Sequence, residues 1–456
     1  MGKKPALVAG LLLLAAFAAS GAAAAQPRKA RPSKPRRPPL DMVWHVETLS
    51  GDVVDSRAAD DPINPASVVK VATSWWALEK LGPDFRFETR FSVRGPVDAA
   101  KGILRGDLVV EGGGDPDFQS ENAFLAAAAL NRLGVRQVTG ALVVNHRFWM
   151  GWEDGSAGME RDPERRAALM GTRLRLALDS RTWNQATRAA WREFAMRRGL
   201  YANHPPRVAV ARGVRVEDVA QGADVAVVHR SKRLADVLRR FNCFSNNDIE
   251  RVGAALGPAG ELAQRIGEAI GAPPDFVRLE TTSGLGENRI TPRLVVRMMR
   301  EFRRTGEKVG RDVESLLPVA GCDPGTVTRF FPQFAAGANA TALVAKTGTL
   351  TATDGGVSVL AGFLNTARGE LVFCIAAPRA AGRVRRARHQ EEEWLLDLMA
   401  SRGGPAPRTC APPLPYADSD ADVVVSALPA ASVAPSASGA GTRAGAPEER
   451  RAAVRP

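Results

Sequence analysis

Cysteine and histidine are scarce in this sequence, whose 456 residues include four cysteines and five histidines. The histidines show no H-E-x-x-H or other metal-ligand spacing, so we expect no metal site and no cofactor. Cys243, Cys322, Cys374 and Cys410 are scattered along the chain, which favours separate structural thiols over a disulfide framework. Separate thiols are also favoured over a Cys243–Cys322 bond, because spacing alone cannot establish bridge geometry. Three complete pairings are open, and the spacing does not choose among them.

Nucleotide-binding and nucleic-acid-binding signatures are also missing. Neither G-x-x-x-x-G-K-[ST] nor G-x-G-x-x-G occurs, so we expect the glycines of "GGGDP" (112–116) to turn the chain rather than bind a phosphate. The net charge of +13 would attract polyanions. No RNA-recognition, zinc-finger or helix-turn-helix signature accompanies it, and much of the charge lies in one linker and in scattered arginines. We therefore expect no nucleic-acid partner.

Long apolar runs are missing after the first residues, so we expect no transmembrane span. Residues 1–25 combine Lys3 and Lys4 with a short apolar run and small residues, the pattern of a secretory signal cut after Ala25. This run is too short to span a membrane. The basic, proline-rich residues 26–40 predict a linker that allows peripheral association with the cell envelope. The Ala/Pro/Ser-rich residues 403–456 predict a disordered tail.

The part between linker and tail has strands and a helix at both of its ends. Residues 42–57 have the pattern of two strands joined at Ser50-Gly51-Asp52. Three strand-like runs separated by glycine-bearing turns cover 341–378, and a helical pattern with a glycine stop covers 385–404. Antiparallel strands with helices on their faces predict an α+β architecture.

A long segment between these ends looks inserted. The runs "ILRGDLVVEGGGDPDF" and "VRQVTGALVVNHRFW" are strand-like, and "SENAFLAAAALNRLG" is typical of a helix. Residues 162–199 are arginine-rich and have a helical pattern. Nothing in this pattern predicts a function for the arginine-rich stretch.

The stretch "NPASVVKVAT" (64–73) carries the first sign of chemistry. Asn64 suits a helix N-cap and Pro65 the first helical position, which places Ser67 in the first turn and Lys70 on the same face. The apolar helix that follows ends at Gly82. A lysine inside it would have a lowered pKa, and a neutral amine beside a hydroxyl is a general base beside a nucleophile. S-x-x-K alone is common, so a surface lysine that follows a serine by chance stays open.

Two later motifs complete a set. Ser245-Asn246-Asn247 is an S-x-N motif, and Lys346-Thr347-Gly348-Thr349 contains K-T-G in a strand-like run. S-x-x-K, S-x-N and K-T-G in this order are the signature of penicillin-recognising serine acyltransferases. The alternatives are that Ser245 is a helix N-cap and that Lys346 is an exposed strand lysine.

Two other stretches are similar to these motifs, and a third has to be compared with the motif of a Ser-His-Asp hydrolase. Ser120-Glu121-Asn122 opens a helix, so Ser120 is expected to be a cap. Arg304-Thr305-Gly306 resembles K-T-G but ends a helical run, where glycine is a stop signal. "TTSGLG" lacks the G-x-S-x-G of a nucleophile elbow, which argues against a Ser-His-Asp hydrolase.

With these motifs the chain resembles the low-molecular-mass class C penicillin-binding proteins, the D-alanyl-D-alanine carboxypeptidase/endopeptidase family. The resemblance covers roughly residues 41–395 and also includes "GILRGDLVVEGGGDP", "TSGLGENRITPRLVVRMM" and "LPVAGCDPGT". The long separation of Ser67 from Ser245 fits, because this family interrupts its transpeptidase-like domain between the two motifs.

The resemblance implies a serine β-lactamase/transpeptidase-like domain formed by residues 41–90 and 229–402 and interrupted by an inserted region, 91–228. Two departures concern substrate preference. The family's usual D-G-S-G-L appears here as T-T-S-G-L (281–285), and Asn246 stands where Asp is frequent.

The resemblance also implies a mechanism and partners. Ser67 attacks the D-Ala-D-Ala bond of a peptidoglycan stem peptide after Lys70 takes its proton, with the backbone N–H groups of Ser67 and Thr349 as oxyanion donors. Ser245 relays a proton to the leaving amine, and Asn247 orients Lys70 and the substrate amide. The substrate-binding residues are expected to be Lys346, Thr347, Gly348 and Thr349. β-Lactams are expected covalent inhibitors, and the family favours export to the periplasm.

Two rival functions stay open. A β-lactamase or esterase of the same fold would need an efficient deacylation base, and none is evident in the sequence. A catalytically silent peptidoglycan-binding scaffold would explain the altered T-T-S-G-L, although it would not need a complete set of motif residues.

Overall fold

The computed structural model describes residues 40–153, 160–218, 222–414 and 422–426. The predicted signal segment 1–25, nearly all of the linker 26–40 and most of the tail lie outside these ranges. No helix within them is long and apolar enough to cross a membrane.

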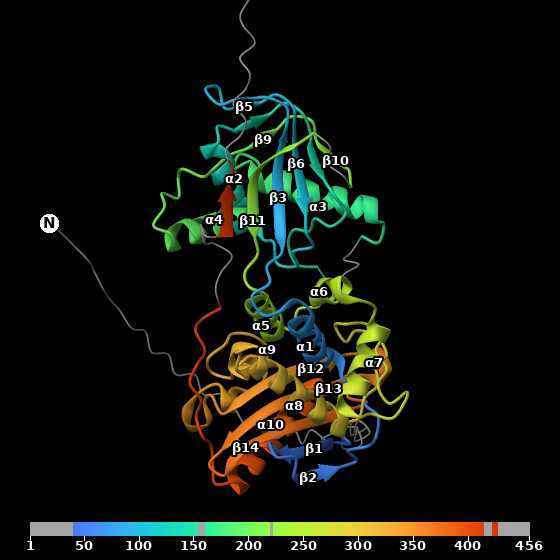
Figure 1. The fold of residues 1–456 in the computed structure, drawn as a ribbon. Coiled ribbons are helices and arrows are strands. Elements are labelled where there is room, and N and C mark those ends of the chain that lie inside the picture. The colour runs from blue at the N-terminus through green and yellow to red at the C-terminus, as the bar shows by residue number, and fades with distance from the viewer. Residues whose placement is uncertain (1–39, 154–159, 219–221, 415–421, 427–456) are drawn as a thin grey trace, which may run out of the picture. The chain divides into compact units, whose positions relative to one another are not determined.

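A five-stranded antiparallel sheet joins the two ends of the predicted transpeptidase-like domain (Figure 1). Its order is β12-β13-β14-β1-β2, and its strands are β1 Val43–Thr48, β2 Val53–Arg57, β12 Leu343–Leu350, β13 Val357–Thr366 and β14 Gly369–Pro378. The predicted hairpin is confirmed, and Gly51 supplies the positive φ of its turn. Early strand β1 pairs with late strand β14, with Val43 opposite Ala376. The five-stranded sheet is therefore complete only when an early and a late segment of the chain pair with each other.

Helices cover both faces of this sheet, and the alternation of side chains along β12 decides what each residue faces. Val344 and Leu350 lie in one hydrophobic core with α1 Val69–Leu81 and α8 Pro292–Lys308. Leu343 and Ala345 lie in a second core with α10 Val384–Ser401. The α+β prediction with helices on the faces of an antiparallel sheet is confirmed.

Shorter elements complete this part of the molecule. They are η1 Ala66–Val68, α5 Leu234–Phe244, α6 Ile249–Leu256, α7 Ala259–Ile270, η2 Val313–Ser315, α9 Thr326–Phe330, η3 Pro332–Phe334, η4 Gly337–Asn339 and η5 Thr353–Gly355.

The central part of the chain builds two further sheets around its own core. The six-stranded sheet has the order β10-β8-β6-β3-β11-β15, and a small sheet has the order β4-β5-β7-β9. Their strands are β3 Glu88–Arg94, β4 Val97–Asp98, β5 Ile103–Leu104, β6 Asp107–Gly112, β7 Gln137–Val138, β8 Leu142–Val144, β9 Ala209–Val210, β10 Val214–Val216, β11 Asp224–Arg230 and β15 Val423–Val425. The helices of this part are α2 Ser120–Arg132, α3 Pro163–Leu178 and α4 Gln185–Arg197.

The arginine-rich stretch is helical, as its pattern predicts, and it forms the two helices α3 and α4. Asp162 caps α3 by accepting a hydrogen bond from the Arg165 N–H, and Asn184 caps α4 by accepting one from the Thr187 N–H. Such side-chain caps favour helix starts, so the second cap separates α4 from α3. The inserted region predicted for 91–228 contains both helices, and its exact limits stay a prediction.

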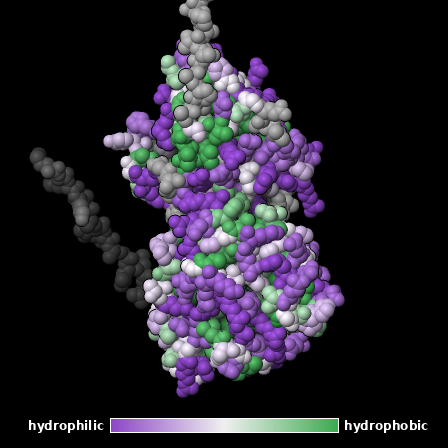
Figure 2. All heavy atoms as spheres, in the orientation of Figure 1, coloured by the Kyte–Doolittle hydropathy of each residue, from purple (hydrophilic) through white to green (hydrophobic). Residues whose placement is uncertain are grey.

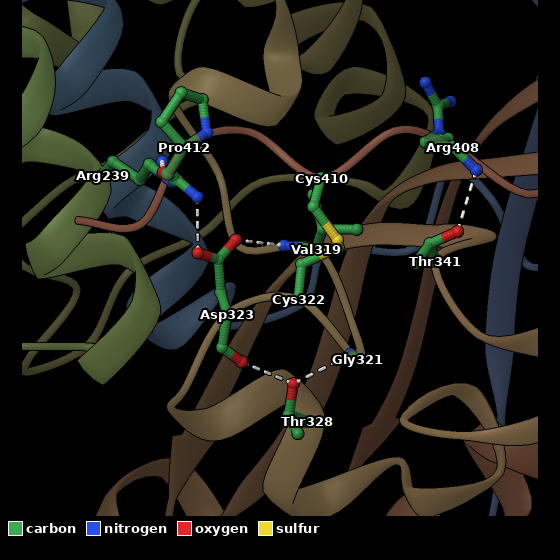
Figure 3. The surroundings of a disulfide bond; sticks show 10 residues. All are labelled: Arg239, Val319, Gly321, Cys322, Asp323, Thr328, Thr341, Arg408, Cys410 and Pro412. Atoms are coloured by element: carbon green, nitrogen blue, oxygen red, sulfur yellow. Dashed lines mark hydrogen bonds and ion pairs between the residues drawn. A yellow bond between two sulfur atoms is a disulfide. The ribbon is translucent and has the colours of Figure 1, made fainter.

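Part of the predicted disordered tail is ordered, so that prediction is wrong for the described residues 403–414 and 422–426. Cys410 forms a disulfide with Cys322, and the Arg239 guanidinium donates a hydrogen bond of 2.7 Å to the Pro412 carbonyl (Figure 3). Strand β15 pairs with β11, with Val425 opposite Val227. A covalent bond and strand pairing offset the disorder that the composition favours.

The expectation of four separate thiols is half correct. Cys243 and Cys374 are free and buried, whereas Cys322 and Cys410 are bonded across 88 residues of sequence. Spacing could not show this pairing, because the chain between the two cysteines folds back through the sheet.

Candidate active site

Ser67 lies in a tight turn that runs into α1. The turn is a 3₁₀ helix, η1, whose N-cap is Pro65. The prediction of Asn64 as N-cap and Pro65 as first helical residue is therefore off by one position. Asn64 still serves the turn, because its Oδ1 accepts a 3.0 Å hydrogen bond from the Ala66 N–H. Ala66 has a φ of 46°, an uncommon conformation for alanine that costs about 1 kcal/mol or more and needs support from its surroundings.

Two glycines provide that support by letting other backbones approach the turn. A Cβ on Gly348 would lie 2.6 Å from the Pro65 carbonyl oxygen and 3.3 Å from the Ser67 nitrogen. A Cβ on Gly284, which has a φ of 87°, would lie 1.9 Å from the Ala66 carbonyl oxygen. Strand β12 and the loop 281–286 therefore flank the Ser67 turn at contact distance, and neither glycine tolerates a side chain.

Lys70 is fully buried and faces Ser67. Its Nζ lies 2.8 Å from Ser67 Oγ and 2.8 Å from Asn247 Oδ1. A third hydrogen bond, of 2.6 Å, goes to the Ser283 carbonyl oxygen. Burial lowers the pKa of Lys70 to about 7, and the nearby Glu250 opposes this shift. The amine is therefore able to exchange a proton with the Ser67 hydroxyl near neutral pH.

Ser245 and Lys346 form a second serine–lysine pair. Ser245 ends α5 in the left-handed conformation, with φ 54° and ψ 40°, so it is not a helix N-cap. Lys346 is fully buried, not exposed, and its Nζ donates hydrogen bonds of 2.8 Å to Ser245 Oγ and 2.7 Å to the Thr347 carbonyl. Burial, followed by the charge of Lys70, holds the pKa of Lys346 well below its usual range.

The two threonines of the K-T-G-T stretch have different partners. Thr347 Oγ1 donates a 2.7 Å hydrogen bond to Thr326 Oγ1, and Thr326 Oγ1 donates a 3.4 Å hydrogen bond to the Cys243 carbonyl. Thr349 Oγ1 instead accepts a 2.8 Å hydrogen bond from Arg388. Neither Thr326 nor Arg388 belongs to one of the three motifs, although Thr326 is the last residue of the stretch "LPVAGCDPGT" that the family resemblance includes.

The loop 281–286, which carries the altered T-T-S-G-L sequence, also contributes hydrogen bonds to the site. Besides accepting from Lys70, Ser283 donates from its Oγ to the Glu250 carboxylate. The Thr281 hydroxyl accepts a 3.1 Å hydrogen bond from the Gly284 N–H, which holds the loop in shape. The T-T-S-G-L departure from the family pattern drew attention to this loop. It did not predict that the Ser283 carbonyl accepts a hydrogen bond from Lys70.

A cavity of about 470 Å³ opens beside Ser245 and Asn247. It is also lined by Trp152, Glu153, Arg173, Phe244 and Asn246. Arg173 contacts the Glu153 carboxylate at 2.5 Å, so charges of both signs face this space. Figure 2 shows a mostly hydrophilic surface with hydrophobic side chains in a few areas, and Trp152 and Phe244 are among the exposed large hydrophobic residues.

The two stretches that are similar to the motifs lie in helices. Ser120 is the first residue of α2, and Gln119 is its N-cap, so the predicted cap is again off by one. The amide of Asn122 contacts His229 Nε2 at 2.8 Å in the core of the central part. Gly306 lies inside α8, which continues to Lys308, so the glycine does not end that helix as expected.

Comparisons with known proteins show which family the chain resembles in sequence. The sequence profile of the D-Ala-D-Ala carboxypeptidase 3 (S13) family matches residues 42–167 and 206–396. The D-alanyl-D-alanine carboxypeptidase of Actinomadura sp. (strain R39) is 26% identical over 416 residues, which cover 72% of this chain and 76% of the relative. Carboxypeptidase Rv3627c of Mycobacterium tuberculosis is 26% identical over 344 residues, covering 69% of this chain and 72% of the relative.

Solved structures share the fold. The predatory endopeptidase Bd0816 of Bdellovibrio bacteriovorus superposes with a TM-score of 0.71 at 22% identity, covering 84% of this chain and 99% of the other. Penicillin-binding protein 4 of Haemophilus influenzae gives a TM-score of 0.55 at 18% identity, covering 78% and 96%. The profile match extends over more than half of the chain and takes in all three motifs. The chain therefore belongs to the D-Ala-D-Ala carboxypeptidase 3 (S13) family, the low-molecular-mass class C penicillin-binding proteins, and is a serine-type D-Ala-D-Ala carboxypeptidase.

Proposed function

We propose that Ser67 is the nucleophile of this carboxypeptidase and that Lys70 is its general base. The observation that carries the proposal is the position of Lys70 Nζ, which is fully buried and 2.8 Å from both Ser67 Oγ and Asn247 Oδ1. In its neutral form Lys70 takes the proton of the Ser67 hydroxyl while Oγ bonds to the carbonyl carbon of the penultimate D-alanine. Asn247 and the Ser283 carbonyl hold the amine in place during this transfer.

Two backbone N–H groups would stabilise the oxyanion that forms. The resemblance to the family gives this role to Ser67 and Thr349. The close approach of Gly348 to the Ser67 nitrogen supports it, because the strand residue after Gly348 then lies next to the nucleophile. Removing one such donor typically costs roughly 10²–10³ in rate.

When the C–N bond breaks, Ser245 relays to the leaving amine the proton that Lys70 took from Ser67, so that Lys70 becomes neutral again and Ser245 keeps its hydroxyl. The 2.8 Å contact between Lys346 Nζ and Ser245 Oγ supports this role. Burial and the charge of Lys70 hold the pKa of Lys346 well below its usual range, and Lys346 serves Ser245 as a hydrogen-bonding partner. Water then hydrolyses the ester, its proton returns to Ser67 Oγ, and the shortened peptide leaves.

We propose peptidoglycan stem peptides ending in D-Ala-D-Ala as substrates and β-lactams as covalent inhibitors of Ser67. A related Bdellovibrio bacteriovorus endopeptidase has been solved acylated by penicillin G. Export to the periplasm, with residues 1–25 as signal and the basic linker 26–40 against the envelope, is part of the proposal. The composition of these residues and the peptidoglycan-directed family support it.

Intact-mass analysis and peptide mapping of residues 26–456 after incubation with benzylpenicillin test the nucleophile. We expect one adduct, on the peptide that contains Ser67. Ser67→Ala should abolish it, whereas Ser120→Ala, in the similar S-x-N stretch, should not. An adduct on any other serine would overturn the assignment.

The absence of an adduct in folded protein would separate the rival functions. Rapid nitrocefin hydrolysis would then indicate a β-lactamase, and no hydrolysis would indicate a silent scaffold. Release of D-alanine from a peptide ending in D-Ala-D-Ala, lost in Ser67→Ala, would exclude both rivals.

A further inference from the structure

Glu250 places a carboxylate one residue away from the hydrogen bonds that hold Lys70. It lies in the first turn of α6, shortly after the S-x-N motif, and is half-buried. Its carboxylate accepts a hydrogen bond from Ser283 Oγ. The carbonyl of the same serine accepts the 2.6 Å hydrogen bond from Lys70 Nζ. One fully buried residue, Ser283, therefore connects the carboxylate to the amine.

The loop 281–286 is fixed at further points, so the position of Ser283 is well determined. The Thr282 carbonyl accepts a 2.6 Å hydrogen bond from Thr73 Oγ1 in α1. A Cβ on Gly253 in α6 would lie 2.2 Å from Thr282 Oγ1, so α6 packs directly against the loop. The carboxylate on α6 and the amine on α1 are therefore held at a fixed separation by the loop between them.

Several packed elements bring titratable groups toward Lys70. Burial lowers the pKa of Lys70, and the charge of Glu250, from α6, opposes this shift. Strand β12 brings Lys346, which is also fully buried and repels a charged Lys70. Near Lys346, α5 contributes the Cys243 thiol, which burial keeps protonated by raising its pKa. The loop 281–286 has no ionisable side chain, and α8 packs apolar side chains against α1.

Asp248, the other acidic residue at the start of α6, has different partners. It is fully buried and contacts Arg251 Nη2 at 2.8 Å. It also accepts a 2.7 Å hydrogen bond from the Glu153 N–H. The guanidinium of Arg251 supplies an opposite charge directly beside Asp248. Glu250 is therefore the acid of α6 whose charge acts on Lys70.

We propose that Glu250 is a positioning residue for the general base: it holds the Ser283 carbonyl against Lys70 Nζ and places one negative charge near the amine. This inference rests on the proposed function, because it assumes that Lys70 takes the proton of Ser67. The negative charge stabilises the ammonium group that this transfer creates. It also favours the ammonium group before the reaction, so Glu250 sets the lower pH limit at which Ser67 is activated.

The pH dependence of acylation by benzylpenicillin, followed by intact mass, tests the proposal. In the wild type the rate should rise with a midpoint near the pKa of Lys70, about 7. In Glu250→Gln the midpoint should move down by roughly one pH unit, the size of shift that a nearby opposite charge typically causes. The plateau rate at high pH should fall by roughly 3- to 10-fold, because the amine becomes a weaker base and Ser283 loses a charged acceptor.

Two further variants separate the charge of Glu250 from its hydrogen bond. Glu250→Asp keeps the charge and should bring the midpoint back toward that of the wild type. Ser283→Ala keeps Glu250 but removes the hydroxyl that it holds, so the plateau rate should fall while the midpoint moves much less than in Glu250→Gln. A wild-type plateau in Ser283→Ala would overturn the positioning part of the proposal.

Glu287→Gln, at an exposed position directly beyond the same loop, is the matched control and should change neither midpoint nor plateau. An unchanged midpoint in Glu250→Gln would overturn the proposal, since a merely structural residue would lower the rate equally at every pH. If Glu250→Gln fails to fold, Glu250→Ala removes the same charge and decides through the same midpoint. A wild-type protein that forms no adduct on Ser67, or forms it at a rate independent of pH, would overturn the proposed function itself.

Discussion

Lys346 lies close enough to Lys70 for the charge of Lys70 to lower the pKa of Lys346. Each of these buried lysines contacts the hydroxyl of a different serine at 2.8 Å, Lys70 that of Ser67 and Lys346 that of Ser245. Two neighbouring ammonium groups without solvent repel each other, so protonation of one disfavours protonation of the other. In the proposed mechanism, a proton that Lys70 takes from Ser67 therefore lowers the pKa of Lys346 further.

The rate of acylation should rise with pH through the neutral range. Burial lowers the pKa of Lys70 to about 7, and only the neutral amine can accept the Ser67 proton. Below the pKa the neutral fraction falls about tenfold per pH unit, and well above it the rate should level off. The measurement is the rate of benzylpenicillin adduct formation between pH 5.5 and 8.5, followed by intact mass. A rate that is flat or falls across this range would contradict a neutral Lys70.

Lys70→Met should lower the acylation rate by roughly 10²–10⁴, the usual contribution of a positioned general base. Methionine fills much of the same volume without an amine, so the helix should stay packed. Lys101→Ala, at an exposed position, should acylate at the wild-type rate. Full acylation of a folded Lys70→Met protein would exclude Lys70 as the base.

Gly348→Ala should impair catalysis and lower stability together. The added Cβ would meet the Pro65 carbonyl oxygen at 2.6 Å, so the strand or the Ser67 turn must move, and a shift in the oxyanion site costs roughly 10² or more in rate. In Gly260→Ala nothing lies within 4 Å of the new Cβ, and activity should not change. Acylation rates and thermal midpoints of both variants provide the test. A wild-type acylation rate in Gly348→Ala would show that β12 does not pack against the Ser67 turn as closely as the structure indicates.

Thiol titration should give a different count in each of three states. In the native protein no thiol should react promptly, because Cys243 and Cys374 are buried and burial raises the pKa of both. Two thiols should react after denaturation, and four after denaturation with reduction, since Cys322 and Cys410 are bonded. Four reactive thiols without reduction would rule out the disulfide.

Cys410→Ser should lower the free energy of unfolding by about 2–5 kcal/mol, because it removes this bond.

Local patterns predicted much of the fold. The hairpin of β1 and β2, the helix that ends at Gly82 and the three consecutive strands β12 to β14 follow from turn residues and from periodicity, which act over a few residues. Helix starts were less accurate. Asn64 and Ser120 each missed the N-cap by one position. At α2 the neighbouring polar residue Gln119 takes the cap position in place of Ser120.

Residues that join the site from distant segments could not be predicted in this way. The Ser283 carbonyl reaches Lys70 from the loop 281–286, and Arg388 reaches Thr349 from the last long helix. No spacing rule connects these positions, because their contacts depend on how the helices pack on the two faces of the sheet. The same holds for Cys322 and Cys410, whose bond closes a stretch of 88 residues.

The sequence by itself determined which chemistry is expected of this protein, because S-x-x-K, S-x-N and K-T-G are short motifs that can be read within a few residues each. Only the tertiary structure decided the protonation and the partners of those residues. The pairing of β1 with β14 closes the sheet, and packing around α1 and β12 removes Lys70 and Lys346 from water. Desolvation and long-range hydrogen bonding are properties of the packed interior, so no local stretch of sequence contains them.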